Sequence, residues 1–226
     1  MVGRATTPKL HKLNIFTIGD LANYDLEILK YKLKSHGLMI WNYANGIDDS
    51  VVRSSNYIEM KGIGNSTTMA FDVDDKATAY KFLLSLSETV GMRLRDSGNC
   101  STVVSISLRG SDMMFYGMQK KLDVATDSTR KIYETACFLF DKLWKGNELR
   151  HLGVRVTEFC NNDFLQCSIL DDFNYEKDSK INTVVDMIRL KYGSDSVMKS
   201  CFLHSGVPFM CGGVGEGDYP MMGSIL

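Results

Sequence analysis

The sequence predicts an α+β fold, in which a small helical region precedes a four-stranded sheet that carries two helices on one face. Two patterns lead to this prediction. Residues 1–44 place apolar residues at helical spacing between short breaks. From residue 58, strand-like and helix-like segments follow in the order strand, helix, strand, strand, helix, strand. This order is typical of a split β-α-β arrangement, whose right-handed crossovers put both helices on one side and leave the other side open.

The helical region is expected to contain several short helices separated by polar or glycine breaks. Thr6, Thr7 and Pro8 are expected to start the first helix, with an N-capping hydroxyl and Pro8 in the first turn, and Thr17 is expected to cap the second. A third helix is expected over Leu26–Leu33, with Gly37 ending it before a further apolar stretch. Such a region is small for an independent core.

The polar segment 48–57, DDSVVRSSNY, shows no periodicity and is interpreted as a linker. We therefore expect three parts: a helical subdomain over residues 1–56, a mixed domain over 57–162 and a tail over 163–226.

The first strand of the mixed domain is expected over Ile58–Phe71, interrupted by Gly62 and Gly64, where backbone could approach a partner closely. Asp74 or Asp75 is expected to cap the helix that follows. The remaining elements are expected at Tyr80–Leu94, Thr102–Arg109, Met114–Leu122, Ile132–Leu143 and Leu149–Phe159.

The last strand shows two faces. Leu152, Val154 and Val156 alternate toward the core, and the residues between them point to the open side. By the same alternation, the open side is predicted to contain Ser105, Ser107, Arg109, His151, Gly153, Arg155 and Thr157. Small and hydroxyl side chains with a few arginines suit contact with phosphate better than base stacking. An RNA-recognition domain would need aromatic residues on its central strands, which these positions lack. An ordinary solvated strand face is the alternative.

Composition narrows the class of protein. The 226 residues carry a net charge of −1, so charge alone does not indicate a polyanion partner, although residues 1–162 have a slight basic excess and the tail an acidic one. The six cysteines form no CxxC pair and the four histidines are far apart, so no metal site is predicted. Without an apolar run near ~20 residues or a signal peptide, we expect no membrane association and a cytoplasmic location.

Several motifs together resemble one family. TIGDLAN (17–23), WNYANGID (41–48), KGIGNSTT (61–68), SISLRGSD (105–112) and LRHLGVRV (149–156) are similar to the C-terminal half of Y-family, DinB/ImpB-MucB-SamB-type translesion DNA polymerases. The stretch 126–144, TDSTRKIYETACFLFDKLW, adds to the match. The resemblance implies that residues 1–56 are most of a thumb and 57–162 a little finger that grips the DNA backbone.

The resemblance also implies where catalysis would be. The family's palm and fingers precede the thumb, and their Mg²⁺-binding carboxylates lie in DxD-like and SxDE-like motifs. No SxDE occurs here, and Asp72-Val73-Asp74 leads into a helix start, where capping is the expected role. Two-metal phosphoryl transfer needs carboxylates that converge on one site. We expect no catalytic residue, no cofactor and no polymerase activity from these residues alone, with Mg²⁺ in the palm of the parent polymerase.

The resemblance also implies DNA contacts. Gly3, Arg4 and Ala5 resemble the second half of a helix-hairpin-helix, which aims backbone amides at phosphate. The strand containing Gly62, Ile63, Gly64, Asn65, Ser66 and Thr67 matches the one whose amides meet phosphate. Arg150 and Arg155 match positions near the template backbone. Arg150 could instead pair with Glu148 or Asp141 on the surface.

The tail contains a second candidate site. Gln166-Cys167-Ser168-Ile169-Leu170 resembles the peptide by which bacterial polymerases bind the sliding clamp, with Gln166, Ser168, Ile169 and Leu170 as the contact residues; a strand end or loop is the alternative. A helix is expected over Ile181–Tyr192 with Val184, Val185, Ile188 and Tyr192 on one side, and a flexible end from Gly206.

Taken together, the sequence predicts a DNA-binding C-terminal part of an error-prone translesion polymerase that acts in DNA repair. Its expected partners are duplex primer-template DNA and the bacterial sliding clamp. Two alternatives remain open: a clamp-tethered protein-interaction module with little DNA affinity, and a ligand-binding regulatory domain of the same topology.

Overall fold

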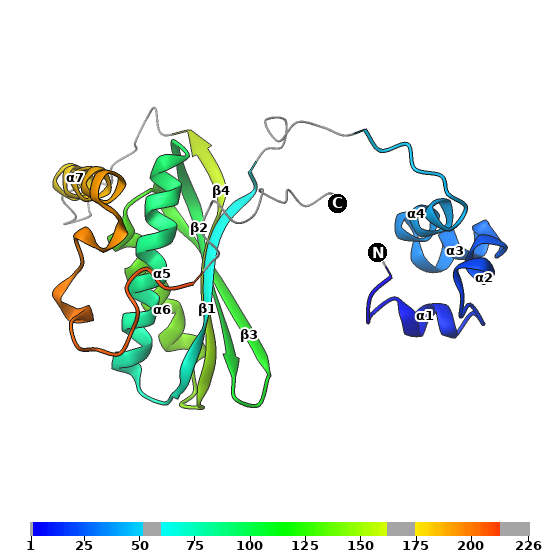
Figure 1. Cartoon of the computed structure of the whole chain (residues 1–226), viewed down its shortest axis with the longest axis horizontal. Coiled ribbons are helices and arrows are strands. Elements are labelled where there is room, and N and C mark those ends of the chain that lie inside the picture. Colours follow the sequence, from blue (N-terminus) through cyan, green and yellow to red (C-terminus); the bar gives the residue numbers. More distant parts are fainter. Residues whose placement is uncertain (1, 52–59, 162–174, 213–226) are drawn as a thin grey trace. The chain divides into compact units, whose positions relative to one another are not determined.

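The computed structural model describes residues 2–51, 60–161 and 175–212 (Figure 1). The chain divides into two compact units, Met1–Tyr57 and Ile58–Leu226, each with a hydrophobic core of its own.

The first unit is helical. Its helices are α1 (Thr7–His11), α2 (Ile18–Ala22), α3 (Leu26–Leu33) and α4 (Ser35–Ala44). They surround a small core of Leu10, Ile15, Leu21, Leu29 and Ile40. The indole N–H of Trp41 donates to the backbone oxygen of Tyr24 at 3.1 Å, which ties α4 to the loop after α2.

Side-chain caps explain the starts of α2 and α3, where Asp25 caps α3 by accepting from the amides of Glu27 and Ile28. Thr17 and Asp20 form a capping box, as the sequence predicts for Thr17. Pro8 lies in the first turn of α1 as predicted, but the predicted N-capping hydroxyl bond is absent, because the Thr6 side chain accepts no hydrogen bond from the helix and the Thr6 backbone is already helical. The hydroxyl of the next residue, Thr7, instead donates to the backbone oxygen of Gly3 at 3.1 Å.

The break between α3 and α4 lies at Lys34, where φ is 55°, so the prediction that Gly37 ends the third helix is also wrong. Gly37 is a buried residue in the first turns of α4. A Cβ atom at this position would lie 2.5 Å from the backbone oxygen of Leu29. The glycine therefore permits close packing of α4 against α3.

Replacing Gly37 with alanine is expected to destabilise the first unit by about 1–3 kcal/mol, because the new methyl group meets backbone atoms that cannot move aside. Trp41 fluorescence during urea unfolding, in a Trp144→Phe background, would follow this unit. Gly19→Ala is the matched control, because its Cβ would meet nothing closer than 3.7 Å and alanine favours helix. Equal stability of both variants would contradict the packing role of Gly37.

The second unit is a four-stranded antiparallel sheet in the order β1-β4-β2-β3, covered on one side by helices (Figure 1). Its elements are β1 (Gly62–Val73), α5 (Lys76–Asp96), β2 (Asn99–Gly110), β3 (Phe115–Thr126), α6 (Thr129–Leu143) and β4 (Leu149–Asn161). The connection through α5 passes β4, and the connection through α6 passes β2. The predicted split β-α-β arrangement, with both helices on one face, is confirmed.

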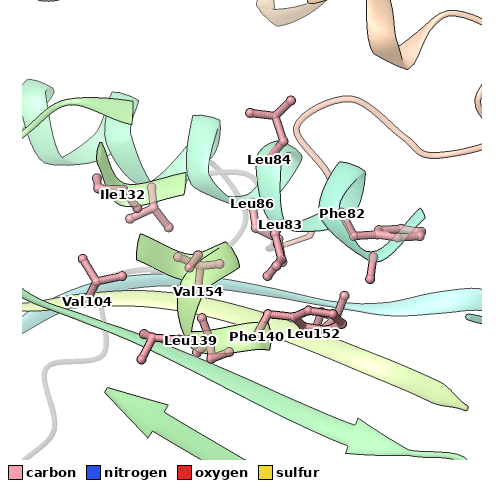
Figure 2. Close-up of a cluster of buried hydrophobic side chains, with 14 of the residues drawn as sticks. Phe82, Leu83, Leu84, Leu86, Val104, Ile132, Leu139, Phe140, Leu152 and Val154 are labelled. Carbon is pink, nitrogen blue, oxygen red and sulfur yellow. The ribbon is translucent and has the colours of Figure 1, made fainter. Parts of the chain in front are cut away.

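The core lies between the helices and the sheet. Figure 2 shows side chains of α5 and α6 packed against those of the central strands, among them Leu83, Leu86, Ile132, Phe140, Val104, Leu152 and Val154. These strand residues are the apolar half of the alternation seen in the sequence, so their neighbours necessarily point to the open side. Asp75, and not Asp74, caps α5 by accepting from the amide of Thr78 at 2.8 Å.

The described segment after β4, residues 175–212, packs against α5 and reaches β1 at its end. Helix α7 (Tyr175–Tyr192) is followed by the short 3₁₀ turns η2 (Ser194–Ser196) and η3 (Ser200–Phe202). Helix α7 contacts α5 through two ion pairs, Arg95–Asp186 and Glu88–Arg189, each 2.6 Å. The segment 175–212 thus belongs to the second compact unit.

The predicted helix over Ile181–Tyr192 lies within α7, and its predicted apolar side is only partly packed. Val184 and Tyr192 are 49% and 67% exposed, whereas Val185 and Ile188 are half-buried.

The end from Gly206 to Gly212 is also held in place, in contrast to the predicted flexibility. Asn65 Nδ2 donates to the backbone oxygens of Cys211 and Gly212, both at 3.0 Å. The Ser85 hydroxyl donates to the oxygen of Pro208 at 2.9 Å and accepts from the amide of Cys211 at 2.8 Å. Residues 213–226 lie outside the described part of the chain. Among the helices that are described, none is both long and apolar enough to cross a membrane.

Candidate nucleic-acid interface

The strand register arranges the open-side residues in rows that cross all four strands. The rows, each read from β1 to β3, are Gly64, Arg155, Ser105 and Gln119; Ser66, Gly153, Ser107 and Gly117; and Thr68, His151, Arg109 and Phe115. None of these rows contains a carboxylate. We call the second of them, Ser66-Gly153-Ser107-Gly117, the small-residue row.

The small-residue row forms a shallow trough. A Cβ atom on Gly153 would lie 2.5 Å from the hydroxyl oxygen of Ser107 and 3.1 Å from Cβ of Ser66, so the central position is open only because it is glycine. An open cavity of about 500 Å³ lies over the row and extends to Arg155 on one side and Phe115 on the other. A rod-shaped polar ligand could lie here close to the backbone.

Arg155 borders the trough on one side. The Arg155 side chain is exposed and lies across β1. A Cβ added to Gly62 would lie 2.9 Å from Nε of Arg155, and a Cβ added to Gly64 would lie 3.1 Å from Cβ of Arg155. The two glycines therefore make room for the arginine and do not interrupt β1, which is continuous, in contrast to the prediction. Among the described residues, no ion pair or hydrogen bond engages this guanidinium, so it is available to a ligand.

His151 and Arg109 border the trough on the other side. His151 Nδ1 lies 3.0 Å from the hydroxyl of Thr68. Burial, and next the charge of Arg109, lower the pKa of His151 below its ordinary value. The Nε atom of Arg109 is buried and has no hydrogen-bond partner within the part of the chain that the structure describes. An acceptor that reached this row would satisfy it.

Other predicted contact residues lie elsewhere. The side chains of Ile63 and Asn65 point to the helix side, where both are buried and Asn65 holds the tail, and Thr67 is half-buried on the same side. Only the backbone of these three residues is therefore near the open face. Arg150 is paired at 2.9 Å with Asp72, and not with Glu148 or Asp141 as the sequence alternatives proposed.

The remaining predicted sites lie apart from this face. Gly3, Arg4 and Ala5 are exposed in the first unit, before α1. The predicted clamp-binding residues Gln166, Ser168, Ile169 and Leu170 lie outside the described residues. No group of three or more residues that could hold a metal ion occurs in residues 2–51, 60–161 and 175–212.

Sequence reasoning missed the residues that β3 adds to the open face. Phe115, Gly117 and Gln119 complete the three rows. Alternation along β3 allows two sets of residues, and the register across the 110–114 turn selects this one. The neighbouring lysines are engaged: Lys121 pairs with Glu158 at 2.9 Å, and Lys120 lies over the ring of Phe138 on the helix side.

Comparisons with known proteins agree with this architecture. Residues 60–169 match the impB/mucB/samB family C-terminal domain. DNA polymerase IV of Clostridium acetobutylicum is 41% identical over 203 residues, which are 90% of this chain and 51% of that protein. DNA polymerase IV 2 of Bacillus subtilis is 34% identical over 89% of this chain and 50% of its own length.

The chain thus spans about half the length of these curated relatives. Among solved structures, a Y-family DNA polymerase chimera of Dbh and Dpo4 matches 71% of this chain and 46% of its own, with a TM-score of 0.52 and 17% identity, which shows a common fold. Residues 60–169 therefore form a C-terminal domain of the impB/mucB/samB family, and the chain is similar to the C-terminal part of Y-family DNA polymerases.

Proposed function

We propose that this protein binds duplex primer-template DNA as the C-terminal, backbone-gripping part of an error-prone translesion polymerase in DNA repair, in the cytoplasm. The observation that carries the proposal is the small-residue row, which is flanked by Arg155 on one side and by Arg109 with His151 on the other. The relatives named DNA polymerase IV support the same role.

The chemistry of the face suits a DNA backbone. A trough without carboxylates lets phosphate oxygens approach strand backbone and hydroxyl groups, while arginines on both sides supply charge. Backbone contacts carry no sequence information, so binding is expected to be nearly independent of sequence and to weaken steeply with salt. In the first unit, we propose that the amides around Gly3, Arg4 and Ala5 add a further phosphate contact.

We propose no catalytic residue and no resident metal among the residues of this chain. Nucleotidyl transfer would need Mg²⁺ held by converging carboxylates, which we assign to a palm domain of the parent polymerase. The nearest DxD spacing does not supply them, because Asp72 pairs with Arg150 and lies beside a helix start.

A second interaction is proposed for the segment 166–170. Its glutamine and apolar residues have the composition of a sliding-clamp-binding peptide. Clamp binding in pull-down or surface plasmon resonance that Gln166→Ala abolishes would support it, and unchanged binding would remove it. This role adds to DNA binding and does not replace it.

Arg155→Ala is expected to weaken binding of a labelled primer-template duplex by a similar factor for different sequences, and to lower the slope of log Kobs against log salt concentration by about one. Fluorescence anisotropy at several salt concentrations measures both quantities. Arg130→Ala is the matched control, because Arg130 lies on α6, on the covered side of the sheet. No salt-dependent binding by the unmodified protein, or equal slopes for the two variants, would refute the proposed interface.

A further inference from the structure

His151 occupies an unusual position for a titratable residue on the open face. It lies in the row between Thr68 of β1 and Arg109 of β2 and is paired in register with both. Helices α5 and α6 lie on the opposite side of the sheet, although Arg93 of α5 lines the cavity over the neighbouring small-residue row. Among the described residues, Arg109 is the charged group that acts on His151; Thr68 is uncharged and the neighbouring Arg150 is paired with Asp72.

The hydrogen bonds within this row leave two donor groups that an anion could use. The Thr68 hydroxyl can either donate to His151 Nδ1 or accept from it, so the 3.0 Å contact survives a change in the protonation of the ring. In the imidazolium form, Nδ1–H would donate to Thr68 and Nε2–H would be free to donate to a ligand. The buried Nε–H of Arg109, which lacks a partner in the described structure, is a second donor in the same row.

We propose that Thr68, His151 and Arg109 form a subsite for one backbone phosphate of duplex DNA, and that His151 takes up a proton when this phosphate binds. The inference rests on the proposed function and names the proton-linked part of the interface. In the free protein, burial and the Arg109 cation favour the neutral ring. A phosphodiester beside both groups reverses the balance, because its negative charge favours the imidazolium.

The sign of the pH dependence follows from linkage. If the pKa of His151 is higher in the DNA complex than in the free protein, affinity rises as the pH falls through the pKa of the complex and levels off below that of the free protein. Because one proton is taken up, the affinity rises by at most about tenfold per pH unit between these two pKa values. Salt screening by itself does not produce such a window.

The experiment is an anisotropy titration of the full chain with a primer-template duplex between about pH 8 and about pH 5.5, at constant ionic strength. The unmodified protein is expected to bind more tightly as the pH falls. In His151→Gln, the slope of log affinity against pH is expected to decrease by up to one, which corresponds to the loss of one proton taken up on binding. Glutamine can still bond to Thr68 but does not titrate. His204→Asn, an exposed histidine on the same unit, is the matched control and is expected to keep the full slope.

A second measurement follows the protonation of His151 directly, in the unmodified protein with and without DNA. Titration of the His151 ring by NMR is expected to give a higher pKa with duplex than without, and Arg109→Gln is expected to raise the pKa in the free protein. Salt-dependent DNA binding with the same pH slope in His151→Gln, or an unchanged His151 pKa on adding duplex, would overturn the subsite and leave the proposed function intact. Absence of salt-dependent binding at every pH would overturn both.

Discussion

Replacing Arg189 with leucine is expected to destabilise the second unit by about 3–5 kcal/mol, since it leaves a buried carboxylate without its main partner. Glu88 and Arg189 are 2% and 6% exposed at the side chain, and their charged atoms lie 2.6 Å apart. Arg189 also donates to the backbone oxygen of Val197 and lies over the ring of Phe209. After the substitution, the remaining cation near Glu88 is Lys199, at 3.2 Å and half exposed.

Urea unfolding followed by circular dichroism would measure this loss. The matched control is Arg130→Leu, which breaks an exposed pair with Glu134 and is expected to leave the unfolding midpoint unchanged. The double variant Glu88→Leu with Arg189→Leu is expected to be more stable than Arg189→Leu alone, because no uncompensated charge remains buried. If Arg189→Leu unfolded at the same urea concentration as the unmodified protein, the ion pair would not hold α7 to α5.

The docking of α7 also shows where sequence reasoning fails. Of the four apolar residues predicted to share one side, Val184 and Tyr192 are 49% and 67% exposed, whereas Val185 and Ile188 are half-buried. The packed side carries Asp186 and Arg189, whose partners Arg95 and Glu88 are 91 and 101 residues away in sequence. Periodicity describes one helix by itself, so it cannot indicate an interface that depends on charges of a distant helix.

The sheet was predictable because its pattern depends only on residues close together in sequence. Alternation is a local property, and the core position of Leu152, Val154 and Val156 fixes which side their neighbours occupy. The open-side residues of β2 and β4 were therefore predicted correctly from the alternation. The contribution of β3 was missed, since register across the 110–114 turn decides which of its residues face the trough. The role of Asn65 was not predictable either, because its partners lie 146 and 147 residues away.

Filling the small-residue row is expected to give a second large effect, on DNA affinity. Gly153→Val is expected to weaken DNA binding by at least about tenfold, or roughly 1.4 kcal/mol, because two methyl groups would fill the centre of the trough and keep a phosphate from the strand backbone. Its salt slope should fall by more than that of Arg155→Ala, since several contacts along the row would be lost together.

This substitution affects the protein as well as the ligand, because the new Cβ atom contacts a neighbouring side chain. A Cβ at residue 153 lies 2.5 Å from the hydroxyl oxygen of Ser107, which must rotate away. The double variant Gly153→Val with Ser107→Ala removes that contact and keeps the trough filled, whereas Ser107→Ala alone keeps it open. If the trough carries the phosphate path, the double variant folds like the unmodified protein but binds DNA as poorly as Gly153→Val, and Ser107→Ala binds almost normally. A folded Gly153→Val protein with unchanged affinity and salt slope would place the DNA away from this row.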